Sequence, residues 1–299
     1  MNVLVVAKKT NLELHGETIR KRVQAGLIDP VYFELLESTH ADHYTCLHEL
    51  YSLLTKLGIN YSTVNRGLYW PDLDTLSAVI TVGGDGTVLE ASHHILDNRL
   101  ILVGVRSANT SVGKLCHCAF DGLAPMIQLL AENKLKPLSV ARLQARVLSA
   151  ETGKVFVTEP ILNDFLFANA SPAATTRYKI AVGDQIEEHR SSGVWISTPC
   201  GSTAAILAAG GKAMPLKSRE FQFIIRELYD VNSASGKKSL ANSPFDPDQI
   251  PIRIENLSEK AVLACDGSHG TVHLTFGDTI HFERGPDLRL AAPSFYHQR

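Results

Sequence analysis

In the first half of the chain, short apolar runs alternate with stretches in which apolar residues recur at helical spacing. The apolar runs predict strands at residues 3–7, 59–64, 78–82 and 100–105. Leucines that recur every three or four residues predict a helix over 43–57, and further helices are expected over 88–96 and 123–133. Strands that alternate with helices predict an α/β layer with a largely parallel sheet.

The pattern changes near residue 138. Residues 140–148 alternate apolar with mostly polar side chains, which is the period of a half-buried strand, and turn residues then separate short β-rich runs. The expected fold class is therefore an α/β N-terminal domain with a largely parallel sheet, plus a second mainly-β domain. We place the first domain at residues 1–138 and the second at 139–284. A C-terminal tail, 285–299, is expected to pack back on the first domain.

Composition excludes several classes of protein. Hydrophobic residues make up 44% of the chain and charged residues 20%, which is enough apolar surface to exclude global disorder. The net charge of -2 offers no overall attraction for nucleic acid. No apolar run approaches the ~18 residues of a membrane-spanning helix, so we expect no membrane partner. Five cysteines without regular spacing favour free thiols in a reducing compartment, and hence a cytoplasmic protein.

The most informative segment is Gly83-Gly84-Asp85-Gly86-Thr87, which follows the third predicted strand. Glycines allow a sharp turn and a close approach of backbone to ligand, and Asp85 should lie at the carboxyl edge of the sheet, where open α/β folds bind ligands. Thr87 and Glu90 match a capping box for the next helix, whose free amides would favour a phosphate. The alternative is an ordinary strand-to-helix turn in which Asp85 only caps the helix. Three glycines around one acid favour a binding site over this alternative.

A second strand-turn-helix segment runs from residue 192 to 205. Pro199 and Gly201 break the strand, and Ser202 or Thr203 can cap the Ala-rich helix that follows. Exposed amides and hydroxyls there would suit a ribose or a phosphate. Taken alone, a capped helix and nothing more is the slightly favoured interpretation. The pair Asn163-Asp164 is also a weak signal alone, because such pairs are common at turns and sheet edges.

Together these segments resemble the NAD kinase family. Gly83 to Thr87 is similar to its G-G-D-G-T signature, which lipid kinases share, and Thr198 to Ala204 is similar to its T-P-x-G-S-T-A segment. Asn163-Asp164 resembles the Asn-Glu segment that holds the dinucleotide, with Asp in place of Glu. These segments, with Cys265-Asp266-Gly267, occur in family order. Ala205 replaces the usual Tyr, and the Ser111-x-Gly113-x-Leu115-Cys116 pattern is most similar to the mitochondrial NAD kinase and plant NADH kinase branch.

The resemblance implies a reaction and a set of site residues. The γ-phosphoryl group of ATP, with Mg²⁺ on the triphosphate, would move to the 2′-hydroxyl of the adenosine ribose of NAD or NADH, giving NADP or NADPH. Asp85 would accept the hydroxyl proton. The binding residues implied are Gly84, Gly86, Thr87, Asn163, Asp164, Gly201, Ser202, Thr203 and Ala204. No side chain is assigned to a metal, since Asp266 is expected to close the turn with Gly267 rather than bind one.

The expected partners are small-molecule nucleotides and, by family analogy, a second copy of the chain in a homodimer or higher homo-oligomer. Two other functions stay open. A diacylglycerol or sphingosine type of lipid kinase would share the Asp85 loop but would need an apolar cleft for its acceptor. A dinucleotide-sensing module would bind NAD without catalysis, and the intact Asp85 argues against it.

Overall fold

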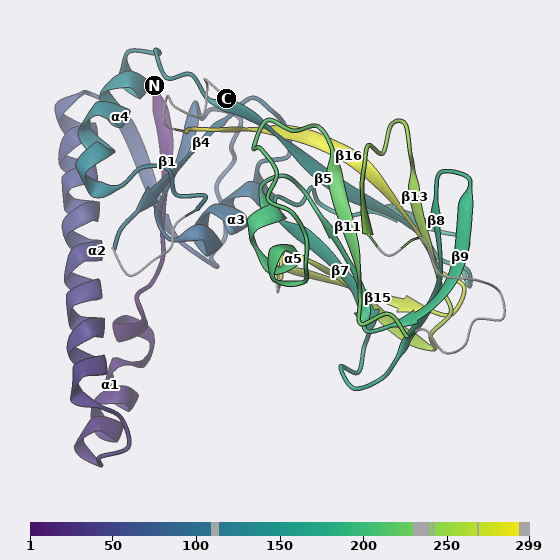
Figure 1. The fold of residues 1–299 in the computed structure, drawn as a ribbon. Coiled ribbons are helices and arrows are strands. Elements are labelled where there is room, and N and C mark those ends of the chain that lie inside the picture. The colour runs from purple at the N-terminus through teal and green to yellow at the C-terminus, as the bar shows by residue number, and fades with distance from the viewer. Residues whose placement is uncertain (109–113, 230–239, 241, 268, 293–299) are drawn as a thin grey trace. The chain divides into compact units, whose positions relative to one another are not determined.

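The computed structural model describes residues 1–108, 114–229, 240, 242–267 and 269–292 (Figure 1). The described chain divides into two compact units. Unit 1 contains residues 1–138 and 288–292, and unit 2 contains residues 139–287. The last seven residues of the expected C-terminal tail, and Ser111 and Gly113 of the motif quoted above, lie outside the described residues.

Unit 1 is a parallel sheet with helices on both faces. Its strands, in the spatial order β2-β1-β3-β4, are β1 (Asn2–Ala7), β2 (Asn60–Asn65), β3 (Ala78–Gly83) and β4 (Ile101–Arg106). The end of β16 (Thr279–Leu290) adds a parallel pairing at β4. The helices are α1 (Asn11–Gln24), α2 (Pro30–Lys56), α3 (Asp85–His94) and α4 (Leu123–Ala131), with a short 3₁₀ turn, η1 (Phe120–Gly122).

Alternate strand residues in unit 1 bury against different helices. Val3, Val5 and Ile80 share one apolar cluster with Leu50 of α2 and Ile127 of α4. Residues one position along the strands face the other way, where α3 lies. The alternation therefore sorts the helices onto the two faces of the sheet.

The four strands of unit 1 are those that the apolar runs predicted, to within one or two residues. The helices differ more. Helix α2 begins at Pro30, where Asp29 accepts a hydrogen bond from the Val31 backbone N–H at 2.9 Å, and not near residue 43. Helix α1 was not predicted at all. It has a capping box formed by Thr10 and Glu13, but most of its residues are exposed and polar, so no long apolar stripe marks it in the sequence.

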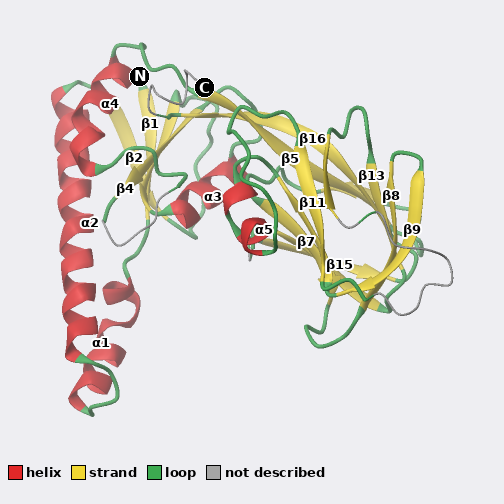
Figure 2. Cartoon of the chain, viewed as in Figure 1, coloured by secondary structure: helices red, strands yellow, loops and turns green. Residues whose placement is uncertain are grey.

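Unit 2 is built almost entirely from strands (Figure 2). The strand bounds are β5 (Leu138–Leu148), β6 (Val155–Val157), β7 (Asp164–Asn169), β8 (Thr176–Val182), β9 (Gln185–Ser191), β10 (Gly193–Ser197), β11 (Phe221–Arg226), β12 (Asn242–Phe245), β13 (Ile252–Asn256), β14 (Lys260–Cys265) and β15 (Gly270–Thr275). Only η2 (Gly201–Thr203) and α5 (Ala205–Ala208) interrupt them among the described residues of this unit.

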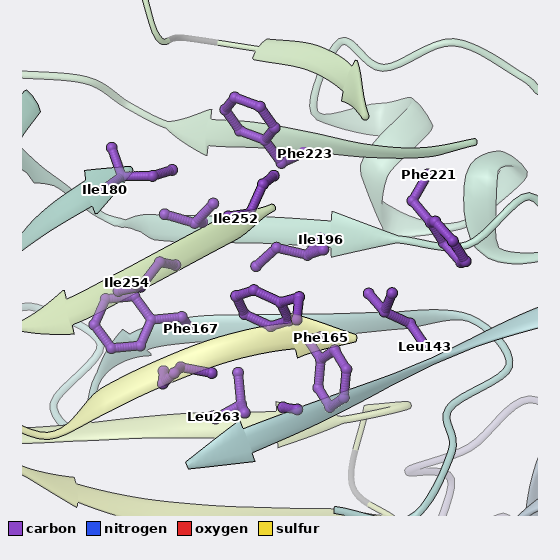
Figure 3. Close-up of a cluster of buried hydrophobic side chains, with 14 of the residues drawn as sticks. Leu143, Phe165, Phe167, Ile180, Ile196, Phe221, Phe223, Ile252, Ile254 and Leu263 are labelled. Atoms are coloured by element: carbon purple, nitrogen blue, oxygen red, sulfur yellow. The ribbon is translucent and has the colours of Figure 1, made fainter. Parts of the chain in front are cut away.

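The strands of unit 2 form two antiparallel layers around one core. One layer has the order β16-β13-β8-β9, with β5 paired to β16 and β6, and the other has the order β12-β11-β10-β7-β14-β15. Side chains from both layers fill the space between them, as Figure 3 shows for Phe165, Phe167, Ile180, Phe223 and Ile254. These side chains come from alternate positions of their strands, which places them on the inner face of each layer.

None of the helices in the described part of the chain has the length and apolar character that crossing a membrane requires.

Candidate functional site

The carboxylate of Asp85 lies at the start of α3, directly after β3, and the backbone holds it in place. Oδ2 accepts a hydrogen bond from the Lys114 backbone N–H at 2.9 Å, and Oδ1 accepts from the N–H groups of Leu115 at 2.8 Å and Cys116 at 3.3 Å. Three consecutive amides therefore fix one acid at the carboxyl edge of the sheet. Asp85 itself is partly exposed, so a ligand can reach it.

Close packing requires a glycine at position 83. A Cβ atom at Gly83 would lie 2.5 Å from Oγ1 of Thr87 and 3.4 Å from Cδ of Lys8. Thr87 is 1% exposed, and its backbone N–H donates to the Gly84 carbonyl at 2.9 Å. The Thr87 side chain therefore supports the loop from inside, whereas Gly84 and Gly86 are partly exposed beside Asp85.

The predicted capping box of Thr87 with Glu90 is wrong. Helix α3 begins at Asp85 with Gly84 as its N-cap, and no side chain caps it. Glu90 instead binds residues that follow β2. Its Oε2 accepts from Nε of Arg66 at 2.6 Å, and its Oε1 accepts from the Gly67 backbone N–H at 2.5 Å. A T-x-x-E pattern cannot reveal this bond, because its partner is 24 residues away in the chain.

The Cys116 thiol lies beside Asp85. Burial, followed by the charge of Asp85, raises the pKa of this thiol to about 12, and the nearby charges of Arg106 and Lys8 oppose that rise. The thiol is therefore protonated and neutral at pH 7, and it offers no competing thiolate nucleophile next to the carboxylate.

In unit 2, the structure brings Asn163 and Gly201 together. A Cβ atom at Gly201 would overlap the backbone carbonyl of Asn163, so only glycine allows this approach. The Asn163 carbonyl also accepts from the Thr198 backbone N–H at 2.9 Å and from the Ser197 hydroxyl at 3.1 Å. The two segments that the sequence singled out independently therefore form one surface of unit 2.

Asp266 anchors the Asn163-Asp164 segment, a role that was not predicted from the sequence. Its carboxylate accepts from the backbone N–H groups of Leu162 at 2.8 Å, Asn163 at 2.7 Å and Asp164 at 2.9 Å. Its own N–H donates to the Asp164 carbonyl at 2.9 Å, and its φ of 45° is the left-handed conformation of a turn. Asp266 thus holds a neighbouring strand start as well as closing the predicted turn.

Asp164 as a whole residue is 5% exposed. Burial, followed by the charge of Asp266, raises the pKa of Asp164 to about 7. The raised pKa reflects the cost of placing a charged carboxylate in this largely buried position beside a second acid.

The expected caps at Ser202 and Thr203 are wrong. The loop continues as η2 and then α5, a helix of four residues with no side-chain cap. Ser202 is fully buried, donates to the Pro199 carbonyl at 2.7 Å and accepts from the Met214 N–H at 2.9 Å. Three of the loop amides are used internally, those of Gly201, Ser202 and Ala204. Thr203 is half-buried and Ala204 is exposed, so these two residues form the accessible part of the segment.

The described residues contain no group of three or more His, Cys, Asp or Glu side chains arranged to hold a metal ion.

Comparison with solved structures defines the class of the fold. The chain aligns over its full length with 96% of an NAD kinase from Archaeoglobus fulgidus in complex with ATP, with a TM-score of 0.66 and 17% identity. The structure of a yeast NADH kinase complexed with NADH is also similar. The alignment covers 98% of this chain and 84% of the yeast chain, with a TM-score of 0.68 and 18% identity. The fold is that of the NAD kinases.

Sequence comparison gives the family. An NADH kinase of Arabidopsis thaliana is 30% identical over 271 residues, which cover 84% of each chain. A probable NADH kinase of Oryza sativa subsp. japonica is 27% identical over 288 residues, covering 89% of this chain and 86% of its own. No family model matches the sequence. The chain belongs to the NAD kinase family.

Proposed function

We propose that this protein is an NAD(H) kinase, which transfers the γ-phosphoryl group of ATP to the 2′-hydroxyl of the adenosine ribose of NAD or NADH. Relatives named NADH kinase at 27–30% identity support this activity. The observation that carries it is the Asp85 carboxylate, which three backbone amides fix at the carboxyl edge of the sheet in unit 1.

The Asp85 carboxylate is accessible to a substrate hydroxyl because Asp85 is partly exposed. A carboxylate has about four acceptor positions on its two oxygens. Two amides donate to Oδ1, and one amide, that of Lys114, donates to Oδ2. The Cys116 thiol also lies within hydrogen-bonding reach of the carboxylate. A ribose hydroxyl would donate to the exposed part of the carboxylate and take the place of the weak thiol donor where the two compete.

In the proposed reaction, the ribose 2′-oxygen attacks the γ-phosphorus and the bond to the β,γ-bridging oxygen breaks. ADP leaves with that oxygen, and Asp85 takes the hydroxyl proton, which it later returns to solvent. Phosphoryl transfer passes through a loose transition state, so the proton can leave late and a weakly basic carboxylate suffices. The rate then depends mainly on the positioning of the two substrates.

The accessible backbone of Gly84 and Gly86 would bind the donor phosphates, with Thr87 supporting the loop from within. In unit 2, Asn163, Asp164, Thr203 and Ala204 would bind the dinucleotide. Gly201 and Ser202 would shape that surface rather than contact the ligand by side chain, since both are buried.

Mg²⁺ would reach the site with the triphosphate. Magnesium is usually held by substrate phosphates, waters and one or two carboxylates. The residues around Asp85 fit a cation held mainly by ATP. When bound, the cation would neutralise phosphate charge.

The test is steady-state kinetics with ATP and either NAD or NADH, comparing the wild type with Asp85→Asn. Loss of a general base should lower kcat by about 10²- to 10⁴-fold. Dinucleotide binding, followed by calorimetry, should change little. Asp121→Asn is the matched control, because Asp121 is an exposed acid of the same unit. Near-normal turnover of Asp85→Asn would remove Asp85 from its proposed role.

The same assay separates the alternative functions. Phosphorylation of diacylglycerol in mixed micelles, without phosphorylation of NAD or NADH, would indicate a lipid kinase. Dinucleotide binding without product in the presence of ATP and Mg²⁺ would indicate a sensing module. The relative rates with NAD and NADH would define the preferred redox form.

We also propose a cytoplasmic, reducing location, which the five free and buried cysteines support. The expected homodimer or higher homo-oligomer stays a prediction, and light scattering of the purified protein would test it.

A further inference from the structure

Three cationic side chains lie in one row across the carboxyl edge of the sheet in unit 1. Gly83 at the end of β3 pairs with Arg106 at the end of β4. On the other side, the ladders of β1 with β3 and β2 bring Lys8 beside Gly83 and Arg66 beside Lys8, one residue beyond the last paired positions. Residues of one row in a parallel sheet share a face, so the row flanks the glycine that leads into the Asp85 loop.

Arg66 is held over this loop by Glu90. The bond from Nε to Glu90 Oε2, at 2.6 Å, uses one edge of the guanidinium. Its Nη1 atom lies 3.1 Å from the position that a Cβ of Gly86 would occupy. The two terminal amino groups of Arg66 form no hydrogen bond within the described residues, and its side chain is 41% exposed. This leaves a fixed, planar donor group beside Gly86, which is the geometry that binds phosphate oxygens.

Unlike Arg66, which pairs with Glu90, neither Lys8 nor Arg106 forms an ion pair with an acid within the described residues. Lys8 is half-buried. Burial and the neighbouring charge of Arg66 lower the pKa of Lys8, while Cys116 opposes the fall. Like charges close together in a partly desolvated place are unfavourable, and a polyanion bound between them would relieve the repulsion.

We propose that Arg66, oriented by Glu90, binds the triphosphate of the phosphoryl donor over Gly86, and that Lys8 and Arg106 extend this binding row on either side of Gly83. This inference rests on the proposed kinase function for the identity of the donor. It adds to the proposed donor site three cationic residues that lie outside the segment from Gly83 to Thr87. Arg66 is a binding residue for the donor, and Glu90 is a positioning residue that acts through it.

The first experiment uses kinetics. Arg66→Gln should lower kcat/KM for ATP by about 10- to 100-fold, the range for lost hydrogen bonds to a charged group. KM for the dinucleotide should stay within about threefold. Arg66→Lys should recover only part of the loss, because an ammonium group cannot bind in the forked manner of a guanidinium. The kcat/KM of Glu90→Gln for ATP should lie between the values of the wild type and of Arg66→Gln.

The matched control is Arg99→Gln. Arg99 belongs to the same unit, its side chain is 45% exposed, and it pairs with Asp74 at 3.0 Å away from the row. Its variant should keep wild-type kinetics.

The second experiment needs no turnover. Inorganic tripolyphosphate should raise the melting temperature of the wild type and of Arg99→Gln, and its affinity by calorimetry should fall about 10-fold or more in Arg66→Gln. Unchanged tripolyphosphate affinity in Arg66→Gln, or equal losses for ATP and dinucleotide, would overturn the inference. A wild type that binds tripolyphosphate through Arg66 but makes no NADP or NADPH would instead refute the proposed function and leave the phosphate site standing.

Discussion

Asp266 accepts a hydrogen bond from the backbone N–H of Asn163 at 2.7 Å, although 103 residues separate them in the chain. The amides on either side of Asn163 donate to the same carboxylate. Asp85 in unit 1 likewise accepts from three consecutive amides. In both units, then, an acid next to a glycine fixes the backbone of a second segment, but Asp85 is partly exposed whereas Asp266 is buried.

Replacement of Asp266 by Asn should destabilise unit 2. The neutral amide has one acceptor oxygen for three donors, so we expect a loss of about 2–4 kcal/mol in the free energy of unfolding. Urea titration monitored by Trp195 fluorescence in a Trp70→Phe background reports on unit 2 alone, since the chain has 2 tryptophans. Asp248→Asn is the control, because Asp248 is 65% exposed and pairs only with Arg284 in the described residues. Equal stability of the two variants would contradict the anchoring role.

Gly201→Ala should be more damaging than an ordinary glycine substitution. The new methyl group would overlap the Asn163 backbone, which cannot move without breaking its bonds to Asp266. We expect a loss of more than about 3 kcal/mol, or insoluble protein. In the control Gly270→Ala, the nearest atom is Cβ of Cys265 at 3.5 Å, an ordinary contact. If both variants fold equally well, the close approach of Gly201 to Asn163 does not constrain the site.

The sequence predicted these sites unevenly, for physical reasons. The Asp85 loop was predicted because its strand, glycines and acid are contiguous, and local geometry determines where the acid lies. The role of Glu90 was misassigned because its partner, Arg66, lies in the segment after β2, and a short motif does not show which strands lie side by side. Ser202 was expected on the surface, but a neighbouring backbone covers it. Contacts that depend on strand order can be identified only once the folded structure is known.

The five cysteines should be unreactive in the folded protein. All five are buried, and burial raises the pKa of Cys46 to about 11 and those of Cys116, Cys118, Cys200 and Cys265 to about 12. Thiol reagents react with the thiolate, so none of the five should react rapidly with Ellman's reagent at pH 8, and all five should react in urea. One fast thiol in the native protein would show that its surroundings open in solution.

The buried carboxyl group of Asp164 should make unit 2 less stable as the pH rises. Its pKa is raised from 3.8 to about 7, first by burial and then by the charge of Asp266. Between these values the folded chain keeps a proton that the unfolded chain has released, so the contribution to stability is complete below about pH 4 and is lost as the pH passes through about 7.

The variant Asp164→Asn tests this expectation, because its side chain at position 164 carries no charge at any pH. Its free energy of unfolding relative to the wild type should therefore rise from pH 5 to pH 7.5 by about 1.4 kcal/mol for each unit crossed, and then level off. Urea titrations at four pH values, monitored by Trp195 fluorescence with both proteins in the Trp70→Phe background, would measure this difference. A difference that stays constant with pH would mean that Asp164 is already ionised in the folded protein, and that it meets its ligand as a carboxylate rather than as a carboxylic acid.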